Sequence, residues 1–407
     1  MKTKTAIIGG GLSGLSCAIQ LEKKGHDYIL IEGSSRLGGR VGSVYEKGYI
    51  FDVGFQVYNT AYSITNSQLD LKALDLQLFK PGAIIHDGKT FQMITDPLRD
   101  IGKIFVSLFS SISNFSDKLK VLSLKLDLAN YSIDSDKTED VSTFEYLESR
   151  GFSKQFIELF FRPFFAGVFL EKKLETSSKF FKYVFSNFSR GLAAIPLDGM
   201  QKIPDQFQNN INMNSVILNS YVKSIKSNNK IILDNEDEII ADSIVITASS
   251  HELTGDKPVY FNPVVNLYFS SQIIPKNGQY IYLFPKDDLI NNIAILSSVS
   301  SNYSSSPSDC LISVSILADM FDKTLIENVK KKLANYFGGN KNSYDCLRSF
   351  LIKKATIKQY NNFFSGNSVN IYDNIVVTGQ HKVNGSIEGA VISGIQASDH
   401  IIKASYS

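Results

Sequence analysis

The sequence of 407 residues contains no tryptophan, only three cysteines and a formal net charge of +2. The cysteines, Cys17, Cys310 and Cys346, are too few and too far apart for a disulfide framework or a zinc site, which favours a reducing compartment. A nearly balanced charge without a long basic run argues against nucleic-acid binding. We therefore expect no metal and no nucleic-acid partner.

Long hydrophobic runs are also missing. No uncharged apolar segment approaches the roughly 20 residues that are needed to cross a bilayer. An expected strand begins within the first residues and leaves no room for a secretion signal. We expect a cytoplasmic protein, either soluble or peripheral to a membrane, and its length predicts more than one hydrophobic core.

A glycine motif near the start of the sequence predicts a dinucleotide site. Lys4–Ile8 form a short apolar strand, and a helix from about Leu12 to Lys24 follows the glycines. Between them, Gly9 allows a tight turn, Gly11 lets the backbone approach a pyrophosphate, and Gly14 lets the helix pack closely on the strand. The helix directs its free N–H groups and the positive end of its dipole at that phosphate.

An acidic residue and a second glycine pair extend the motif. A strand over Tyr28–Ile31 ends at Glu32, where a carboxylate can hold a ribose 2′-OH. The pair Gly38-Gly39 lets the chain pass close to a diphosphate, and a flanking arginine, Arg36 or Arg40, can fork onto its oxygens. A plain nicotinamide dehydrogenase does not need this second element, so the pattern favours FAD.

From Glu32 to Arg40 the sequence resembles the superfamily of FAD-dependent amine oxidases, protoporphyrinogen oxidases and phytoene desaturases. Members carry an acid, a short spacer and a Gly-Gly-Arg that embraces the FAD. The resemblance returns where a strand over Asn374–Gly379 leads to a helix over Gly385–Ala397. It implies that this strand and the helix N-terminus meet the ribityl chain and the flavin ring. Gln380 stands where the family usually has an acid, and an amide can still hydrogen-bond the ribityl or phosphate groups.

Further segments carry the resemblance. Gly54-Phe55-Gln56-Val57 resembles the glycine-rich stretch that meets the isoalloxazine, and Pro196–Met200 resembles a Pro-x-Gly-Gly-Met turn. Residues 214–226 and 230–233 alternate as strands would, and the family implies that the backbone of Val222 faces the adenine. No cysteine lies in the C-terminal flavin segment, so we expect FAD to be bound non-covalently.

The motifs and the resemblance together assign the cofactor contacts. The residues expected to contact FAD are Gly9, Gly11, Leu12, Ser13, Gly14, Glu32, Gly33, Arg36, Gly38, Gly39, Arg40, Val41, Gly54, Phe55, Gln56, Val57, Val222, Gly379, Gln380, Ile387, Glu388, Gly389 and Ala390.

The interleaved segments predict an α/β fold. A Rossmann-like FAD-binding domain, discontinuous in sequence, would take residues 1–60, 210–254 and 366–407. A second, substrate domain of mixed sheet and helices would take residues 61–209, mainly helical, and 255–365, rich in sheet. Within the latter we expect strands at 264–269, 280–284 and 310–315, followed by a helix over Lys323–Phe337.

Two apolar stretches in the first insertion leave alternatives open. Residues 100–130 space their apolar side chains as a helix does, and residues 152–188 are dense in phenylalanine. Both stretches can be core helices. They can also form a greasy channel, a membrane-resting face that admits a lipid-like substrate, or a subunit interface.

The expected chemistry is removal of a hydride from a C–H bond, which a flavin performs while the protein positions the bond. His381 and Arg162 are the catalytic candidates. His381 follows the flavin strand and can contact the ring or substrate, move a proton, or be structural. Arg162 lies among phenylalanines, where it can orient a polar substrate end or pair with Glu158 one turn earlier.

Four functions remain open. The leading one is a desaturase or dehydrogenase of a hydrophobic small molecule such as a carotenoid-like polyene. The second is an oxidase of amines or of a protoporphyrinogen-type tetrapyrrole, with oxygen or quinone as acceptor. The missing tryptophan and aromatic cage, and the lack of a match to the family's lysine around Lys353 and Lys354, argue modestly against amines. The third is a redox-neutral isomerase, and the fourth is a non-enzymatic flavin or lipid carrier.

Overall fold

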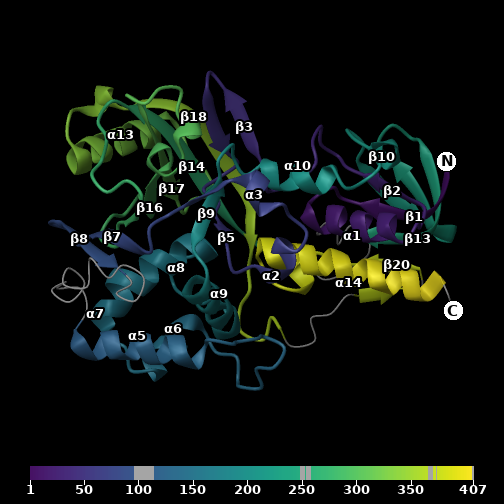
Figure 1. Cartoon of the computed structure of the whole chain (residues 1–407), viewed down its shortest axis with the longest axis horizontal. Helices are drawn as coiled ribbons and strands as arrows, with labels where there is room; N and C mark the ends of the chain where they lie inside the picture. Colours follow the sequence, from purple (N-terminus) through teal and green to yellow (C-terminus); the bar gives the residue numbers. More distant parts are fainter. Residues whose placement is uncertain (96–113, 248–252, 254–257, 365–369, 373, 406–407) are drawn as a thin grey trace.

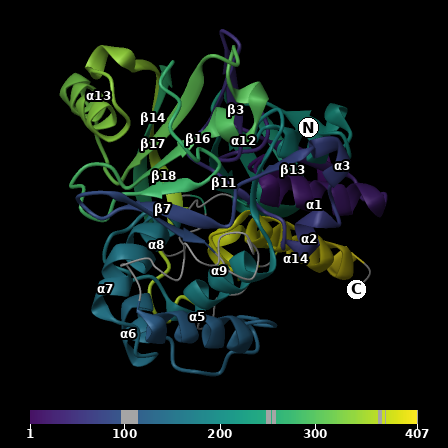
Figure 2. The same cartoon turned by 60° about the vertical axis from the view of Figure 1, so that its left-hand side comes forward.

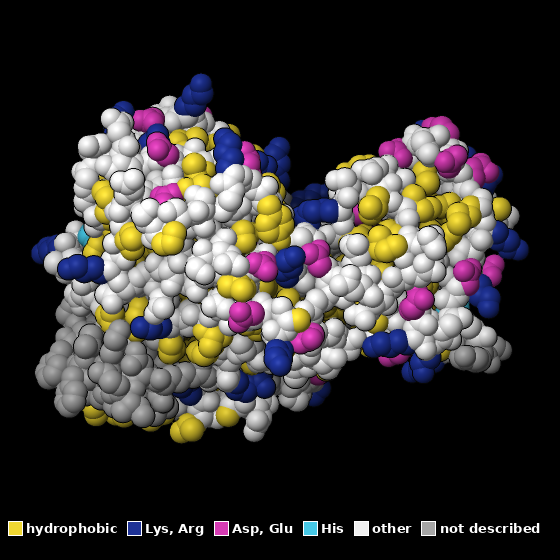
Figure 3. Space-filling model, turned by 45° about the horizontal axis from the view of Figure 1, so that its top comes forward, with side chains coloured by type: hydrophobic (Ala, Val, Ile, Leu, Met, Phe, Trp, Pro, Cys, Tyr) yellow, Lys and Arg dark blue, Asp and Glu magenta, His cyan; other side chains and the backbone are white. Residues whose placement is uncertain are grey.

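The computed structural model describes residues 1–95, 114–247, 253, 258–364, 370–372 and 374–405. Two sheets and a group of helices make up an elongated molecule that narrows between a larger and a smaller lobe (Figures 1 and 3). Acidic and basic side chains are interspersed over the face seen in Figure 3. The expected α/β class is confirmed, whereas the domain boundaries stay a prediction.

The first sheet, in the smaller lobe, takes strands from three separated parts of the sequence. Its order is β10-β2-β1-β13-β12-β11, with β20 beside the end of β13 and β19 beside β20. These strands are β1 (Lys2–Ile8), β2 (Tyr28–Ile31), β10 (Val216–Ile217), β11 (Val222–Lys226), β12 (Lys230–Leu233), β13 (Glu238–Ile246), β19 (Asn370–Tyr372) and β20 (Ile375–Val377). The strand expected over residues 214–226 is interrupted, because Asn219 adopts a positive φ of 53° between β10 and β11.

Helices α1 (Leu12–Lys23) and α14 (Ile387–Ser405) lie side by side against this sheet (Figure 1). Their close approach depends on small side chains. A Cβ at Gly394 would stand 2.1 Å from the Ser13 carbonyl oxygen. The Ser13 and Ser16 hydroxyls each donate to a carbonyl of α14, at 2.9 Å in both cases. The two ends of the sequence therefore form one layer.

The second sheet, in the larger lobe, has the order β18-β14-β17-β16-β15-β7-β8. Its strands are β7 (Gly82–His86), β8 (Phe91–Thr95), β14 (Phe261–Ser271), β15 (Ile281–Leu283), β16 (Asn292–Ile295), β17 (Cys310–Ile316) and β18 (Asp345–Ile357). The first insertion, residues 61–209, is therefore not helical throughout. Its β7–β8 hairpin joins the strands of the second insertion, residues 255–365, through a parallel pairing of β7 with β15. The helix expected over Lys323–Phe337 is α13, with the same bounds.

Helices cover both faces of the second sheet. Alternation along β7 shows this, because Ile84 joins the core under α13 while Ala83 and Ile85 join the core of a helical layer on the other side. Figures 1 and 2 both place this layer across the sheet from α13. The layer comprises α5 (Phe115–Asp127), α6 (Thr143–Ser149), α7 (Lys154–Phe156), the π-helical turn η2 (Ile157–Phe161), α8 (Arg162–Phe169) and α9 (Ser178–Arg190).

Phenylalanine builds the core of this helical layer. Seven of the rings in residues 152–188 are buried: Phe152, Phe156, Phe161, Phe165, Phe169, Phe180 and Phe181. Four are only partly buried at its edge: Phe160, Phe164, Phe185 and Phe188. The phenylalanine-rich stretch thus supplies core helices and also leaves an aromatic edge. In the other apolar stretch, Ile101, Ile104, Phe105, Leu108, Phe109 and Ile112 lie outside the described residues.

Short elements connect these layers. They are β3 (Ser43–Glu46), β4 (Tyr49–Asp52), β5 (Tyr58–Asn59), α2 (Ser63–Asn66), α3 (Leu71–Leu74), β6 (Leu76–Leu78), β9 (Ala193–Pro196), α10 (Lys202–Gln208), α12 (Leu296–Val299), η3 (Met213–Ser215), η4 (Ser227–Asn229), η5 (Ser301–Tyr303), η6 (Lys341–Ser343) and η7 (Gln380–Lys382). Within the described part of the chain, no helix is both long enough and apolar enough to cross a membrane.

Candidate functional site

The glycine turn between β1 and α1 has the tight geometry that the motif predicts. Gly9 has a φ of 103°, which favours glycine. A Cβ on Gly14 would stand 1.9 Å from the Gly9 carbonyl oxygen, so no side chain fits there. Gly11 is different, since it has an extended backbone (φ −72°, ψ 179°) at the N-cap of α1, and its Cβ would meet only Gly39 Cα at 3.9 Å. Space beside Gly11 is therefore open.

The second glycine pair lies directly against this turn. The Gly38 N–H donates to the Gly10 carbonyl at 2.9 Å, and Gly11 and Gly38 form an isolated parallel bridge. Both Gly38 (φ 112°) and Gly39 (φ 59°) adopt conformations that favour glycine. Two glycine-rich loops and the N-terminus of α1 thus converge where the sequence predicts a diphosphate.

Glu32 holds the two loops in place. Its carboxylate accepts from the Gly10 N–H at 2.7 Å and from the N–H and hydroxyl of Ser34 at 2.8 and 2.7 Å. Next to it, a Cβ on Gly33 would stand 2.6 Å from the ring of Tyr221, which is 65% exposed. Val222, the expected neighbour of the adenine, follows that tyrosine as the first residue of β11.

The two arginines have different surroundings. The Arg36 guanidinium donates to the carbonyl oxygens of Gly39 and Val41, at 2.9 and 3.1 Å, and to the Gln201 side chain at 3.0 Å. The Arg36 guanidinium therefore stabilises its own loop, whereas the sequence predicts that it contacts the cofactor. The prediction that it contacts FAD stays a prediction.

Arg40 is an exposed residue. Its side chain keeps accessible surface, yet the surrounding protein lowers its pKa to about 10 through burial. The guanidinium lies 5.5 Å from the centroid of the Phe261 ring. With its amide oxygen turned toward the arginine, Gln380 accepts from both terminal nitrogens, at 2.8 Å from Nη2. No carboxylate of the described residues forms an ion pair with Arg40, which leaves its charge available to an anionic ligand.

Gln56 carries an acceptor without a donor. Its amide nitrogen donates to the carbonyl oxygens of Arg40 and Val53, both at 2.7 Å, which fixes the amide. The Oε1 atom is buried and has no hydrogen-bond partner in the part of the chain that the structure describes. A buried acceptor of this kind is costly unless a ligand supplies a donor, as the N–H groups of a flavin ring can. In the same stretch Gly54 has a φ of 86°, Phe55 packs edge-on against Phe79, and Val57 is partly buried.

Asp52 forms buried hydrogen bonds next to the segment Gly54–Val57. Its carboxylate is 1% exposed and accepts from Ser43 Oγ at 2.6 Å, Tyr303 Oη at 2.7 Å and the Met200 N–H at 3.0 Å. Burial raises the pKa of Asp52 to about 6, and these three donors oppose the rise. The Pro196–Met200 turn is thereby tied to the segment around Gly54.

The C-terminal segment brings a strand end and a helix start to the same place. Gly379 follows β20 and has a φ of 131°. A Cβ on Gly379 would stand 2.9 Å from His381 Nδ1, so the buried His381 ring lies against this glycine. Ile387, Gly389 and Ala390 form the first turn of α14. The dipole of this helix can stabilise negative charge on a ring at its N-terminus.

Some expected cofactor contacts are engaged within the protein. Glu388 accepts from the Ile64 and Thr65 N–H groups at 2.9 and 2.8 Å and so caps α2. The Ser13 hydroxyl joins α1 to α14, and Leu12 is 4% exposed within the core. Only the backbone of these three residues remains for a cofactor.

Two tyrosines that the sequence did not single out meet at this site. Tyr62, at the N-cap of α2, and Tyr183, in α9, are both near the Ser386 hydroxyl that precedes α14. Burial raises the pKa of Tyr62 well above its ordinary value and that of Tyr183 to about 12, and Ser386 opposes both shifts. The Tyr183 hydroxyl is buried and has no hydrogen-bond partner among the described residues. No sequence motif marks these positions, because only the fold brings them together.

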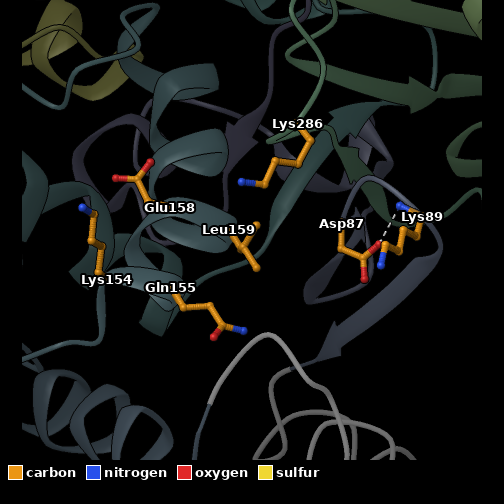
Figure 4. Close-up of a pocket in the computed structure, with 7 residues that line it drawn as sticks. All are labelled: Asp87, Lys89, Lys154, Gln155, Glu158, Leu159 and Lys286. Carbon is orange, nitrogen blue, oxygen red and sulfur yellow. Dashed lines mark hydrogen bonds between the residues drawn. The ribbon is translucent and has the colours of Figure 1, made fainter.

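Arg162 belongs to a different region. It forms an ion pair with Glu158 at 2.8 Å and donates to the Lys172 carbonyl at 2.7 Å, so the pairing alternative is the one observed. Glu158 in turn lines an open pocket of about 390 Å³ between η2 and the β7–β8 turn (Figure 4). Its lining residues are Asp87, Lys89, Lys154, Gln155, Glu158, Leu159 and Lys286. None of these residues belongs to the glycine loops, so a catalytic role of Arg162 has no support from its position.

The site thus fits a flavin dinucleotide on three observations. Two glycine loops present backbone N–H groups and a helix N-terminus to one place, Arg40 supplies a cation, and Gln56 supplies an unused acceptor. Within the described residues, no group of three histidine, cysteine or carboxylate side chains is placed to hold a metal ion. This combination defines a dinucleotide-binding flavoprotein.

Comparison with known proteins gives the family. The sequence model described as "Flavin containing amine oxidoreductase" matches residues 12–402, so the chain belongs to this family of flavin-dependent oxidoreductases. This membership confirms the resemblance, the enzymatic character and the flavin cofactor that the motifs predict.

The relatives differ in what they act on. Protoporphyrinogen oxidase 2 of Arabidopsis thaliana is 28% identical over 169 residues, which is 40% of this chain and 32% of that protein. The 4,4'-diapophytoene desaturase of Staphylococcus haemolyticus is 27% identical over 208 residues, 50% of this chain and 35% of that protein. Each match therefore spans about a third of the relative. Wild-type putrescine oxidase bound to putrescine has a similar fold, with a TM-score of 0.71 at 15% identity and 99% of both chains covered.

Proposed function

We propose that this protein removes a hydride from a C–H bond of a hydrophobic small molecule, with FAD held non-covalently. The observation that carries this proposal is the aromatic edge of the helical layer. Phe188 of α9 packs edge-on against Phe164 of α8, with ring centroids 5.4 Å apart. Tyr183 is also on α9 and lies near Ser386, which precedes α14. Partly buried aromatic rings on the helix that carries Tyr183 favour an apolar substrate.

Different residues of the chain can bind different parts of the cofactor. FAD, when bound, supplies the acceptor for the hydride, which carries two electrons and a proton. The N–H groups around Gly11 and Gly39 can bind its diphosphate, and Glu32 can hold its adenosine ribose. Arg40 and Gln380 can bind its anionic part, and Gln56 Oε1 can accept from its ring.

The protein orients the substrate and excludes water. The phenylalanine edge removes water from an apolar body, which strengthens the electrostatic interactions inside the site. The buried Tyr183 hydroxyl can donate to a polar atom at one end of the substrate, and Tyr62 lies near it across Ser386. His381 is close enough to the strand-ending glycine to position the segment that meets the ring.

Non-covalent binding is supported by where the cysteines lie. Cys17 is fully buried in α1, and burial raises the pKa of its thiol to about 12, so it is a poor nucleophile. Cys310 and Cys346 are on β17 and β18 of the second sheet. We therefore expect acid precipitation to release all of the flavin into the supernatant.

An absorbance spectrum of the purified protein tests the proposal. We expect oxidised flavin bands, and we expect them to bleach on anaerobic addition of a lipid extract from the host. Adding the polar amine putrescine in place of the extract is the matched comparison. Bleaching by putrescine alone would replace the proposal with an amine oxidase, and turnover that requires prior reduction of FAD would replace it with an isomerase. Reoxidation by air or by an added quinone then identifies the acceptor.

A further inference from the structure

Tyr221 is a large exposed side chain beside the loop that Glu32 holds. It is 65% exposed, and its ring and hydroxyl make no ring contact or hydrogen bond with the described residues. A single exposed tyrosine is ordinary on a protein surface. The surroundings of this tyrosine, however, fix its backbone and cover one face of its ring.

Hydrogen bonds on two sides fix the backbone of Tyr221. Before it, the Ser220 N–H donates to the Glu32 carbonyl at 3.0 Å. The Tyr221 N–H donates to the Asp234 carboxylate at 3.2 Å, and the Tyr221 carbonyl accepts from the Asp234 N–H at 2.9 Å. The ring therefore projects from a backbone that is bonded both to the Glu32 loop and to the neighbouring turn, although the side chain itself is exposed.

Gly33 lies against one face of the ring. A Cβ built on Gly33 would stand 2.6 Å from Cε1 of Tyr221 and 2.8 Å from both Cδ1 and Cζ. Nearly equal distances to three adjacent atoms place the glycine over the ring face, because an approach to the ring edge would separate these distances more. Gly33 does not have a positive φ, so the space that the ring takes, and not the backbone conformation, requires a glycine here.

The Glu32 carboxylate indicates where the adenosine of FAD lies. An acid at this position hydrogen-bonds the ribose 2′-OH in dinucleotide-binding folds. Its two oxygens accept three hydrogen bonds from Gly10 and Ser34, which leaves about one lone-pair position of four for that hydroxyl. The base is attached to the ribose carbon next to the one that bears the 2′-OH, so it lies close to Glu32. Gly33 is the next residue, and the exposed face of the Tyr221 ring that covers it is within reach of the base.

We propose that the exposed face of Tyr221 stacks on the adenine of FAD. Every nucleobase has a π-face, and aromatic side chains beside such a base bind it by stacking. FMN lacks the adenosine half of the cofactor, so this contact favours FAD over FMN. The inference adds a cofactor-binding residue, and it rests on the proposed function only in that FAD is the cofactor.

Titration of FAD into the cofactor-free protein, followed by the change in flavin fluorescence, tests the inference. Tyr221→Leu keeps an apolar side chain without a π-face, and the Kd for FAD should rise about 5- to 150-fold, as expected for the loss of one base–aromatic stack. Tyr221→Phe is the matched control, because it keeps the ring, and its Kd should stay within about twofold of the wild-type value. The Kd for FMN should be the same in all three proteins. Because the side chain is exposed, both variants should unfold close to the wild-type temperature.

Gly33→Ala provides an independent test of the ring position. Its methyl group would push the exposed ring aside, so the Kd for FAD should rise in the wild-type background. In Tyr221→Ala there is no ring to displace, and adding Gly33→Ala should change the Kd by less than about twofold.

Three results would overturn the inference: equal effects of Gly33→Ala in the two backgrounds, equal Kd values for Tyr221→Phe and Tyr221→Leu, or an FMN affinity that falls as much as the FAD affinity. Wild-type protein that binds no FAD would overturn the flavin site together with this inference. Wild-type FAD affinity in Tyr221→Leu would overturn the stacking alone, and the proposed function would stand.

Discussion

Two glycines three positions apart should respond to substitution in opposite ways. Gly11 has an extended backbone that any residue adopts, and a Cβ there meets nothing closer than 3.9 Å. Replacing a glycine in a compatible conformation changes the free energy of unfolding by about 0.4–1 kcal/mol in the stabilising direction. We therefore expect the Gly11→Val protein without cofactor to unfold at the wild-type temperature or slightly above it.

The cofactor should be lost all the same. The valine side chain would occupy the space beside the two glycine loops that the diphosphate requires, and we expect the Kd for FAD to rise about 100-fold or more, which is about 2.7 kcal/mol. At Gly14 the new Cβ would stand 1.9 Å from the Gly9 carbonyl oxygen. Gly14→Ala should destabilise the cofactor-free protein by about 1–3 kcal/mol, because only the backbone can give way.

The assay combines thermal unfolding of the cofactor-free proteins with titration of FAD by fluorescence quenching. Cofactor-free forms must be compared, since bound FAD itself raises the unfolding temperature. Wild-type FAD affinity in Gly11→Val would refute the placement of the diphosphate. A Gly11→Val protein as unstable as Gly14→Ala would refute the argument that the space beside Gly11 is open.

Three further predictions follow from the same site. Glu32→Ala should raise the Kd for FAD about 10- to 150-fold in the same titration, because it removes a charged hydrogen bond that contributes about 1.5–3 kcal/mol. An unchanged Kd would contradict the assigned role of Glu32. Burial raises the pKa of Asp52 from 3.8 to about 6, so its contribution to stability is present below pH 3.8 and is lost as pH rises through 6. In urea unfolding, the free energy of unfolding of the wild type should fall by up to about 3 kcal/mol between pH 4 and 7 relative to that of Asp52→Asn. Parallel pH profiles of the two proteins would contradict this prediction. Tyr183→Phe removes a buried hydroxyl that has no partner among the described residues, so the unfolding midpoint should stay the same or rise while reduction of FAD by the extract slows. A large loss of stability would show that the hydroxyl is bonded within the protein.

Local signals predicted the elements of the fold well. The strand, glycine turn, helix and second strand at the start appear as β1, α1 and β2, and the helix over Lys323–Phe337 has the expected bounds. These segments carry their information in glycine positions and in periodicity, which act over a few residues. The break at Asn219 was missed because alternation alone does not reveal a residue with positive φ.

Pairings between distant segments escaped the same reasoning. The β7–β8 hairpin joins a sheet whose other strands lie far along the sequence, and no periodicity encodes a partner. Glu388 was expected at the cofactor, yet its carboxylate caps α2, which is more than 300 residues away in the sequence. Long-range contacts of this kind depend on the complete packing arrangement.

By itself, the sequence determined that this protein binds a flavin dinucleotide, because the glycines and Glu32 are needed where a diphosphate and a ribose approach the backbone. Only the tertiary structure decided which side chains remain available. Arg36 and Arg40 are alike in sequence, but neighbouring carbonyl oxygens engage Arg36, while Arg40 forms no ion pair with a carboxylate of the described residues. In the same way, folding left the Tyr183 hydroxyl without a partner among the described residues and left the Tyr221 ring exposed over Gly33. A side chain's availability depends on what surrounds it in space, which a linear pattern does not contain.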